Sequence, residues 1–387
     1  MVGKKYPSEM KSIIDPKTGY TVIQLTNSGS NNYHLYFTEN SFCKGRRELI
    51  FYSDRSSKKA GHYNLFSMNL DTGEMTQLTD FSGPISHCVK PPEGGNLFCF
   101  HNNHIVSVNM KSFEQNLLYA CSPEWRLTSL SLNKSANRLG FILNEDVDIA
   151  AGANYTGFTE RMYAIKRSKI MVTRIDNTDT SEVFQDTHQL GHFQFAPDDD
   201  ALAAYCHEGP WNLVQQRIWL LDLISRTVMP CFRQEADDSV GHEFWTRDNL
   251  IFFDNRRAGH DGTITSNKTQ VYKPVEDKKQ TPYIGFADKQ GRAIRTIDMP
   301  FYCNHYHANN DNSILAGDDV EDIVLINIAG TAAKLQTLCF HGTSWYGQSA
   351  HCHPTFDWEG RFVLWTSDFG GNHNLYMTDT SQVVWDP

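Results

Sequence analysis

The stretch LIFYSDRSSKKAGHYNLFSMNLDTGEMTQLTD, Leu49–Asp80, contains three strand-like segments separated by polar turns. Two apolar runs, Leu49–Tyr52 and Asn64–Met68, are followed by the segment EMTQLTD, Glu74–Asp80. Short runs of apolar and aromatic residues bounded by Gly, Asp and Ser are typical of antiparallel strands. The stretch therefore predicts a small unit of consecutive β-strands.

The first apolar run of this unit recurs along the whole chain, at intervals of roughly 40 to 65 residues. The seven runs are Leu49–Tyr52, Leu97–Phe100, Leu139–Leu143, Ala201–Tyr205, Leu250–Phe253, Ile314–Gly317 and Phe362–Trp365. Four short antiparallel strands repeated radially form the blades of a β-propeller. We therefore predict an all-β chain, a seven-bladed β-propeller, with residues 1–387 as one domain. A pair of β-sandwiches is the rival fold, but it would not need seven similar units.

The two ends of the chain compete for one place in this fold. The segment YTVIQLTN, Tyr20–Asn27, resembles EMTQLTD but precedes the first blade. We expect it to pair with the last blade and close the ring, although the C-terminal SQVVWDP, Ser381–Pro387, is a competitor for that position. The segments Asn144–Lys169 and Asp261–Thr281 are expected insertions in the third and fifth blades.

Composition limits the partners and the location. The formal charge of −10 argues against nucleic acid as a partner. No signal peptide and no apolar segment long enough to span a membrane is evident, so no membrane partner is expected. The nine cysteines are scattered without a CxxC pair, which is typical of reduced cysteines in a cytoplasmic protein.

Histidines recur six residues before five of the turns that precede the seven runs. They are His87, His192, His242, His305 and His353. The first strand of a propeller blade lines the central channel, so this spacing predicts imidazoles around one mouth of the channel. Loops carrying Arg55 and His207 are expected near the same mouth, as is Arg217 at the start of a third strand. Together these basic groups suit a small anionic ligand.

The stretch GQSAHCHP, Gly347–Pro354, suggests a metal site. Gln348, His351 and His353 lie close in sequence, and either His305 or His307 in HYHANND can supply a third imidazole. Imidazole and oxygen donors suit manganese, iron or nickel, whereas structural zinc is usually closed by four Cys or His ligands. The ordinary alternative is that each histidine only hydrogen-bonds its neighbours.

His242 is the candidate general base, because an imidazole titrates near working pH. Glu243 follows it directly, and adjacent residues of a strand point to opposite faces, so Glu243 is not expected to orient His242.

Several motifs together resemble the oligogalacturonate lyase family: SVGHEFWTRD, HEGPW followed by QQRIW, HYHANNDNSIL followed by GDD, and GQSAHCHP. The resemblance covers essentially the whole chain. It implies a cytoplasmic, seven-bladed enzyme of pectin breakdown that cleaves short galacturonides, chiefly digalacturonate, by β-elimination with Mn²⁺.

The same resemblance implies roles for individual residues. His242 would abstract the C5 proton, and Arg217 would bind substrate near the reaction centre. The metal ligands would be His305, Gln348, His351 and His353, with His307 as the competitor of His305. Arg55, His87 and His207 are further candidates for substrate contacts.

Two other functions are alternatives to that of a lyase. A non-catalytic TolB-like propeller that binds a protein or peptide is one, because fold does not fix function. A metal-dependent hydrolase or isomerase of a sugar acid is the other. A propeller-capped serine peptidase is disfavoured, since the chain lacks a Gly-x-Ser-x-Gly elbow.

Overall fold

The computed structural model describes residues 1–57, 59, 61–152, 155–176, 178–257, 259–266, 280–345 and 350–385. The chain divides into two compact units. Unit 1 comprises Met1–Asn102, Val106–Asn116 and Cys303–Pro387, and unit 2 comprises Asn103–Ile105 and Leu117–Tyr302.

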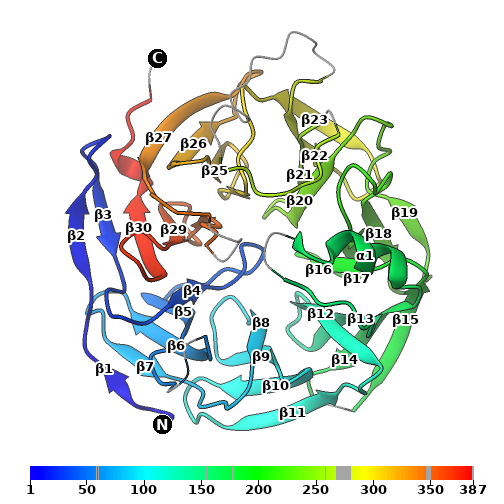
Figure 1. The fold of residues 1–387 in the computed structure, drawn as a ribbon, viewed down its shortest axis with the longest axis horizontal. Helices are drawn as coiled ribbons and strands as arrows, with labels where there is room; N and C mark the ends of the chain where they lie inside the picture. The colour runs from blue at the N-terminus through cyan, green and yellow to red at the C-terminus, as the bar shows by residue number, and fades with distance from the viewer. Residues whose placement is uncertain are drawn as a thin grey trace. The chain divides into compact units, whose positions relative to one another are not determined.

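Antiparallel sheets built from consecutive strands make up both units (Figure 1). The first sheet of unit 1 contains β1 (Lys5–Tyr6), β4 (Asn32–His34), β5 (Glu48–Ser53), β6 (Asn64–Asn69) and β7 (Met75–Gln77). The next sheet, most of which belongs to unit 1, contains β8 (Ile85–Val89), β9 (Asn96–His101), β10 (His104–Asn109) and β11 (Gln115–Ala120). Near its C-terminus, unit 1 has the sheet of β24 (Tyr306–Ala308), β25 (Ile314–Asp318), β26 (Asp322–Asn327) and β27 (Lys334–Phe340).

Unit 2 has three four-stranded sheets. The first contains β12 (Trp125–Leu132), β13 (Arg138–Glu145), β14 (Ser168–Arg174) and β15 (Thr180–Asp186). The second contains β16 (Leu190–Ala196), β17 (Asp199–His207), β18 (Ile218–Asp222) and β19 (Val228–Pro230). The third contains β20 (Val240–Trp245), β21 (Ile251–Asn255), β22 (Tyr283–Ala287) and β23 (Ala293–Asp298). The expected insertion Asn144–Lys169 contains the short helix α1 (Phe158–Ala164). Most of the second expected insertion lies outside the described residues.

The last sheet unites the two ends of the chain. It contains β2 (Lys11–Ile14) and β3 (Thr21–Gln24) from the N-terminal part, and β28 (Thr355–Phe356), β29 (Phe362–Ser367) and β30 (Asn374–Asp379) from the C-terminal part. Val22 is paired with Thr378, so β3 lies antiparallel to β30 (Figure 1). The competing C-terminal segment instead begins with the 3₁₀ turn η4 (Thr380–Gln382).

This organisation confirms the predicted fold class, an all-β seven-bladed β-propeller. Each of the seven apolar runs overlaps the second strand of its sheet, from β5 to β29. The apolar runs in these strands are largely buried. Leu49, Phe51, Leu364 and Leu375, for example, share one core cluster between the first and last sheets of unit 1.

Two further expectations can be compared with the structure. All nine cysteines are buried and none forms a disulfide. Within the residues that the structure describes, no helix is both long and apolar enough to cross a membrane.

Candidate functional site

Three histidines of unit 1 converge on one point. The potential ligand nitrogens of His305, His351 and His353 all lie within 4.8 Å of one another. The ring centroids of His305 and His353 are 4.1 Å apart, and those of His351 and His353 are 5.1 Å apart. His305 immediately precedes β24, while His351 and His353 precede β28, so two neighbouring sheets supply the imidazoles. We call these three residues the histidine triad.

His307 does not belong to the triad. Its Nδ1 accepts a hydrogen bond from the backbone amide of Phe356 at 3.2 Å, and its ring packs against the Phe356 ring. Of the two candidates, the structure therefore brings only His305 to the other histidines. Gln348, the fourth expected ligand, lies outside the described residues.

Asp318 orients His305. This fully buried carboxylate at the end of β25 accepts a hydrogen bond from His305 Nδ1 at 2.8 Å and another from the His305 backbone amide at 2.5 Å. Because an ionised carboxylate can only accept, Nδ1 carries the ring proton and Nε2 becomes the nitrogen able to bind a metal. Asp318 begins the acidic pair of the GDD motif, and its role was not predicted from the sequence.

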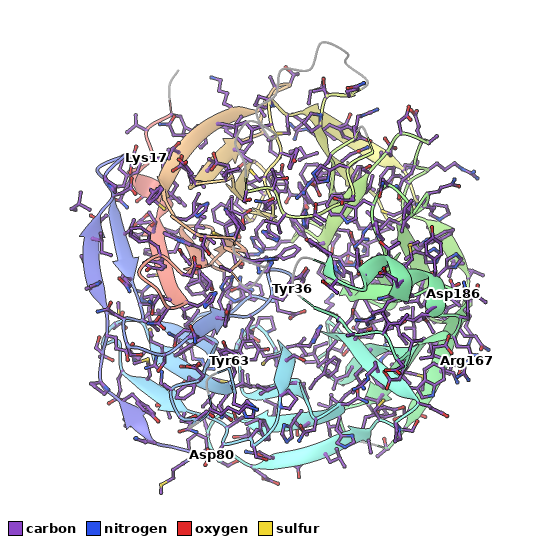
Figure 2. All side chains as sticks on the ribbon, in the orientation of Figure 1. Lys17, Tyr36, Tyr63, Asp80, Arg167 and Asp186 are labelled. Atoms are coloured by element: carbon purple, nitrogen blue, oxygen red, sulfur yellow. The ribbon has the colours of Figure 1, made fainter. Side chains whose placement is uncertain are left out.

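His34 fixes the backbone of His353. His34 Nε2 lies 2.7 Å from the carbonyl oxygen of His353, and its Nδ1 lies 2.7 Å from the Thr366 hydroxyl. A carbonyl only accepts, so Nε2 is the protonated nitrogen and Nδ1 accepts from Thr366. Burial lowers the pKa of His34 to about 4, which keeps the ring neutral. The rings of Tyr36 (labelled in Figure 2) and Phe37 pack on His353, with centroids 5.2 and 5.7 Å away.

The donor set of the triad fits a divalent transition metal. The three imidazoles come from the residues just before β24 and β28. The imidazole of His305 already has the hydrogen-bonded carboxylate that usually accompanies a metal-binding histidine. Neutral imidazole ligands suit iron, nickel or zinc, and additional oxygen ligands would suit manganese.

A shared backbone distortion underlies the histidine spacing seen in the sequence. His87, His192, His242 and His353 have left-handed φ angles between 46° and 50°, and Ser129 takes the corresponding position in β12 with φ 54°. The strand register shifts at four of these positions, which marks β-bulges. Such backbone is uncommon for residues other than glycine, although histidine tolerates it better than most. His305 alone of the five predicted histidines lacks the left-handed backbone.

His242, in unit 2, has the surroundings of a neutral base. Its Nδ1 lies 3.1 Å from Oδ1 of the buried Asp254, which holds the Nδ1 proton and makes Nε2 the basic nitrogen. The Trp211 ring stands edge-on to the imidazole, with centroids 4.9 Å apart. Burial lowers the pKa of His242, and the Arg256 guanidinium lowers it further, while Asp254 opposes both.

Arg217 is buried in a network of charges. Its Nε donates to Glu243 Oε2 at 3.2 Å, its Nη1 donates to Glu208 Oε1 at 3.3 Å, and only 3 % of its side chain is exposed. His192 Nδ1 lies 2.9 Å from the other oxygen of Glu243. Burial alone would lower the pKa of His192, but Glu243 and Glu208 raise it. Glu243 therefore pairs with Arg217 and His192, in agreement with the expectation that it does not orient His242.

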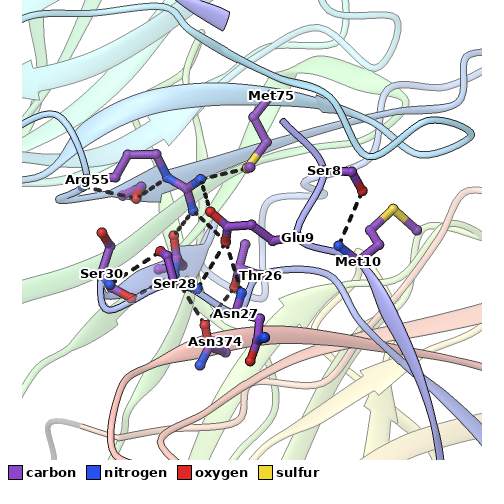
Figure 3. Close-up of polar contacts among 12 residues, drawn as sticks. Ser8, Glu9, Met10, Thr26, Asn27, Ser28, Ser30, Arg55, Met75 and Asn374 are labelled. Carbon is purple, nitrogen blue, oxygen red and sulfur yellow. Dashed lines mark hydrogen bonds and ion pairs between the residues drawn. The ribbon is translucent and has the colours of Figure 1, made fainter. Parts of the chain in front are cut away.

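The remaining sequence candidates have other contacts. Arg55 donates to Glu9 Oε1 at 2.9 Å and to Asn32 Oδ1 at 2.8 Å, with only 4 % of its side chain exposed (Figure 3). A sugar contact by Arg55 would require these bonds to break. His87 is exposed on β8 and packs against the Phe100 ring. His207, at the end of β17, directs its Nε2 to Asp186 at 3.1 Å.

Comparison with known proteins establishes the family. The family model described as oligogalacturonate lyase matches residues 1–384. The chain belongs to the oligogalacturonate lyase family. This membership makes the protein an enzyme and argues against a non-catalytic propeller.

Other oligogalacturonate lyases match over nearly their full length. The oligogalacturonide lyase of Pectobacterium atrosepticum is 22 % identical and the oligogalacturonate lyase of Dickeya dadantii 21 %, each over 99 % of both chains. A solved structure described as oligogalacturonate lyase in complex with manganese is 24 % identical, with a TM-score of 0.84 over 98 % of both chains. The crystal structure of an oligogalacturonate lyase from Vibrio parahaemolyticus has a TM-score of 0.85 at 24 % identity over 98 % of both chains. These structures share the fold of the present chain.

Proposed function

We propose that the protein cleaves short oligogalacturonides, chiefly digalacturonate, by metal-assisted β-elimination. Family membership supports the action on oligogalacturonides. The convergence of His305, His351 and His353 carries the metal-assisted part of the proposal. The solved relative in complex with manganese supports Mn²⁺ as the cation, and the neutral imidazole donors are compatible with it.

In this proposal the histidine triad and Gln348 hold the metal. A bound divalent cation would bind the uronate carboxylate as a Lewis acid and stabilise the negative charge that develops on the adjacent carbon, C5. Asp318 would keep His305 in the tautomer that presents Nε2. His34 would hold the peptide group of His353 in place.

His242 is the proposed base. Its Nε2 takes the C5 proton, and the electrons of the C5–H bond form the C4=C5 double bond as the C4–oxygen bond breaks. Asp254 retains the Nδ1 proton and stabilises the imidazolium that forms. The departing oxygen gains a proton, so the products are an unsaturated uronate and a shortened galacturonide. No water adds to the broken bond, so the paired carboxylates of a glycoside hydrolase are not required.

Arg217 remains part of the proposal as a cation near the reaction centre. Its ion pairs with Glu208 and Glu243 support a positioning role. His87 and His207 remain proposed substrate contacts. The cytoplasm remains the proposed location, supported by nine buried cysteines without a disulfide.

The test is to incubate the protein with digalacturonate and Mn²⁺ and to follow the ultraviolet absorbance of the new conjugated carboxylate. A chelator should abolish the signal and added Mn²⁺ should restore it. His62→Ala should give the same signal as the wild type, because His62 is a loop histidine outside all the clusters described. Absence of the conjugated product from protein that contains Mn²⁺ would refute the proposed elimination.

A further inference from the structure

A second group of metal-binding side chains lies in unit 2. Asp186 ends β15, His188 follows in the turn to β16, and His207 ends β17; Asp186 is labelled in Figure 2. One ligand atom from each residue lies within 4.8 Å of the other two. None of these three residues belongs to the histidine triad or to the pairs formed by His242 and Arg217. His207 is also a proposed substrate contact, and its Nε2, which faces Asp186, can serve only one of the two proposed roles at a time.

Both imidazoles face the same carboxylate from different strands. His188 Nδ1 lies 2.9 Å from Asp186 Oδ1, and His207 Nε2 lies 3.1 Å from Asp186 Oδ2. The two rings are stacked almost parallel, with centroids 4.2 Å apart and planes inclined by 11°. Because a metal ion lies in the plane of each imidazole that binds it, the exposed His188 ring must turn out of this stack to share an ion with His207. A four-coordinate zinc ion with bonds near 2.0–2.1 Å separates its ligand atoms by about 3.3 Å. The spacing of the nitrogens from the carboxylate is already close to that value.

The surroundings favour a fixed site with one open side. The side chains of Asp186 and His207 are 16 % and 13 % exposed, whereas that of His188 is 62 % exposed. The His207 ring also packs against Trp219, with centroids 5.2 Å apart. Two ligands are therefore held by the protein interior, and the third faces water that can complete the coordination.

We propose that Asp186, His188 and His207 bind a Zn²⁺ ion, with water as the fourth ligand. Two imidazole nitrogens and one carboxylate oxygen are a donor set that zinc commonly takes, and the ion replaces the protons that now link the rings to Asp186.

The site links the turn after β15 to the end of β17. The Glu208 amide donates to the Gln189 carbonyl at 2.8 Å, and the His207 amide donates to the Arg217 carbonyl at 2.9 Å. The bound ion thus fastens the segment that carries Glu208, one of the two carboxylates on Arg217. We infer a stabilising role for this ion, separate from the metal of the proposed reaction.

The experiment counts zinc in the Mn²⁺-loaded protein after addition of Zn²⁺ and removal of the excess. Wild-type protein should retain one zinc equivalent more than His188→Ala and Asp186→Asn, because any exchange at the triad is common to all three. His62→Ala should match the wild type. Zn²⁺ should also raise the thermal midpoint of the wild type by more than that of His188→Ala, since each ion that binds the native state stabilises it.

His188 is the most informative position, because its exposed side chain can be removed without opening the core. A Co²⁺ titration gives a second readout, because a four-coordinate site adds visible absorption bands in the wild type that His188→Ala lacks. Equal zinc content in the wild type and in folded His188→Ala would overturn the assignment. The count does not depend on lyase activity, so failure of this proposal and failure of the proposed reaction are distinguishable.

Discussion

Replacement of Asp318 by Asn should weaken metal binding at the histidine triad without unfolding the protein. The wild-type carboxylate accepts both the Nδ1 proton and the backbone amide of His305. An Asn side chain keeps one oxygen for the amide but presents an NH₂ group to Nδ1. The ring then shifts its proton to Nε2, which removes the lone pair that a metal needs.

The expected loss of metal affinity can be estimated from the hydrogen-bond partners of metal-binding histidines in other proteins. Removal of the partner behind a metal-binding histidine typically lowers affinity by about 10–100-fold, which is about 1.4–2.8 kcal/mol. Because Asp318 is fully buried and its bond to Nδ1 is 2.8 Å long, we expect the upper part of this range. The Mn²⁺ dissociation constant, measured by calorimetric titration of the purified apoprotein, checks it directly.

Asp319→Asn is the matched control for this change. Asp319 is the next residue of the same motif, and its Oδ1 accepts from the backbone amides of Glu321 and Asp322. An Asn oxygen can accept both bonds, so the control should bind Mn²⁺ as the wild type does. If Asp318→Asn is folded and has wild-type Mn²⁺ affinity, the argument that this carboxylate sets the tautomer of His305 is wrong.

Three other predictions concern unit 2. His242→Gln should lower kcat by about 10²–10⁴-fold and leave the Mn²⁺ content unchanged, because the base is lost while the ligands stay; a lower metal content would contradict its role as base. The acid limb of kcat/KM against pH should have a midpoint below the usual value of about 6.5, because burial and Arg256 lower the pKa of His242. Arg256→Met removes a positive neighbour, so it should move that midpoint to higher pH, whereas Arg256→Lys should not; an unchanged midpoint in the Met variant would rule out the charge effect. Arg217→Met should destabilise the fold by about 3–5 kcal/mol in urea unfolding, because Glu208 and Glu243 stay buried without their cation. If this variant changes only KM and leaves stability intact, Arg217 binds the substrate and does not stabilise the buried network.

The fold could be predicted from the sequence because its signal is repeated. Each sheet has one apolar run that must be buried on both faces, and these runs alone located the second strand of all seven sheets. The histidine spacing also had a structural basis, since His242 and His353 share the same left-handed backbone. The left-handed backbone itself could not be foreseen, because histidine is not the residue that such φ angles normally require.

The partners of the site residues were harder to predict than the residues themselves. Asp318 and Asp254 lie on the strand next to the histidine that each orients, 13 and 12 positions along the chain. Nothing in local spacing distinguishes such a carboxylate from the many acidic residues in turns. The burial of Arg217 could not be predicted from the sequence either, because it depends on Glu208 and Glu243 from two different sheets.

The sheet that pairs β3 with β30 has a consequence for biosynthesis. The strands β2 and β3 leave the ribosome early in synthesis, whereas β28, β29 and β30, which follow His351 and His353 in the chain, leave it much later. The edge of β3 that pairs with β30 therefore stays unpaired until β30 has been synthesised. A chain that stops before β30 lacks the strand that this edge requires. Metal capture by the histidine triad is thus a late event, available only after His351 and His353 have left the ribosome.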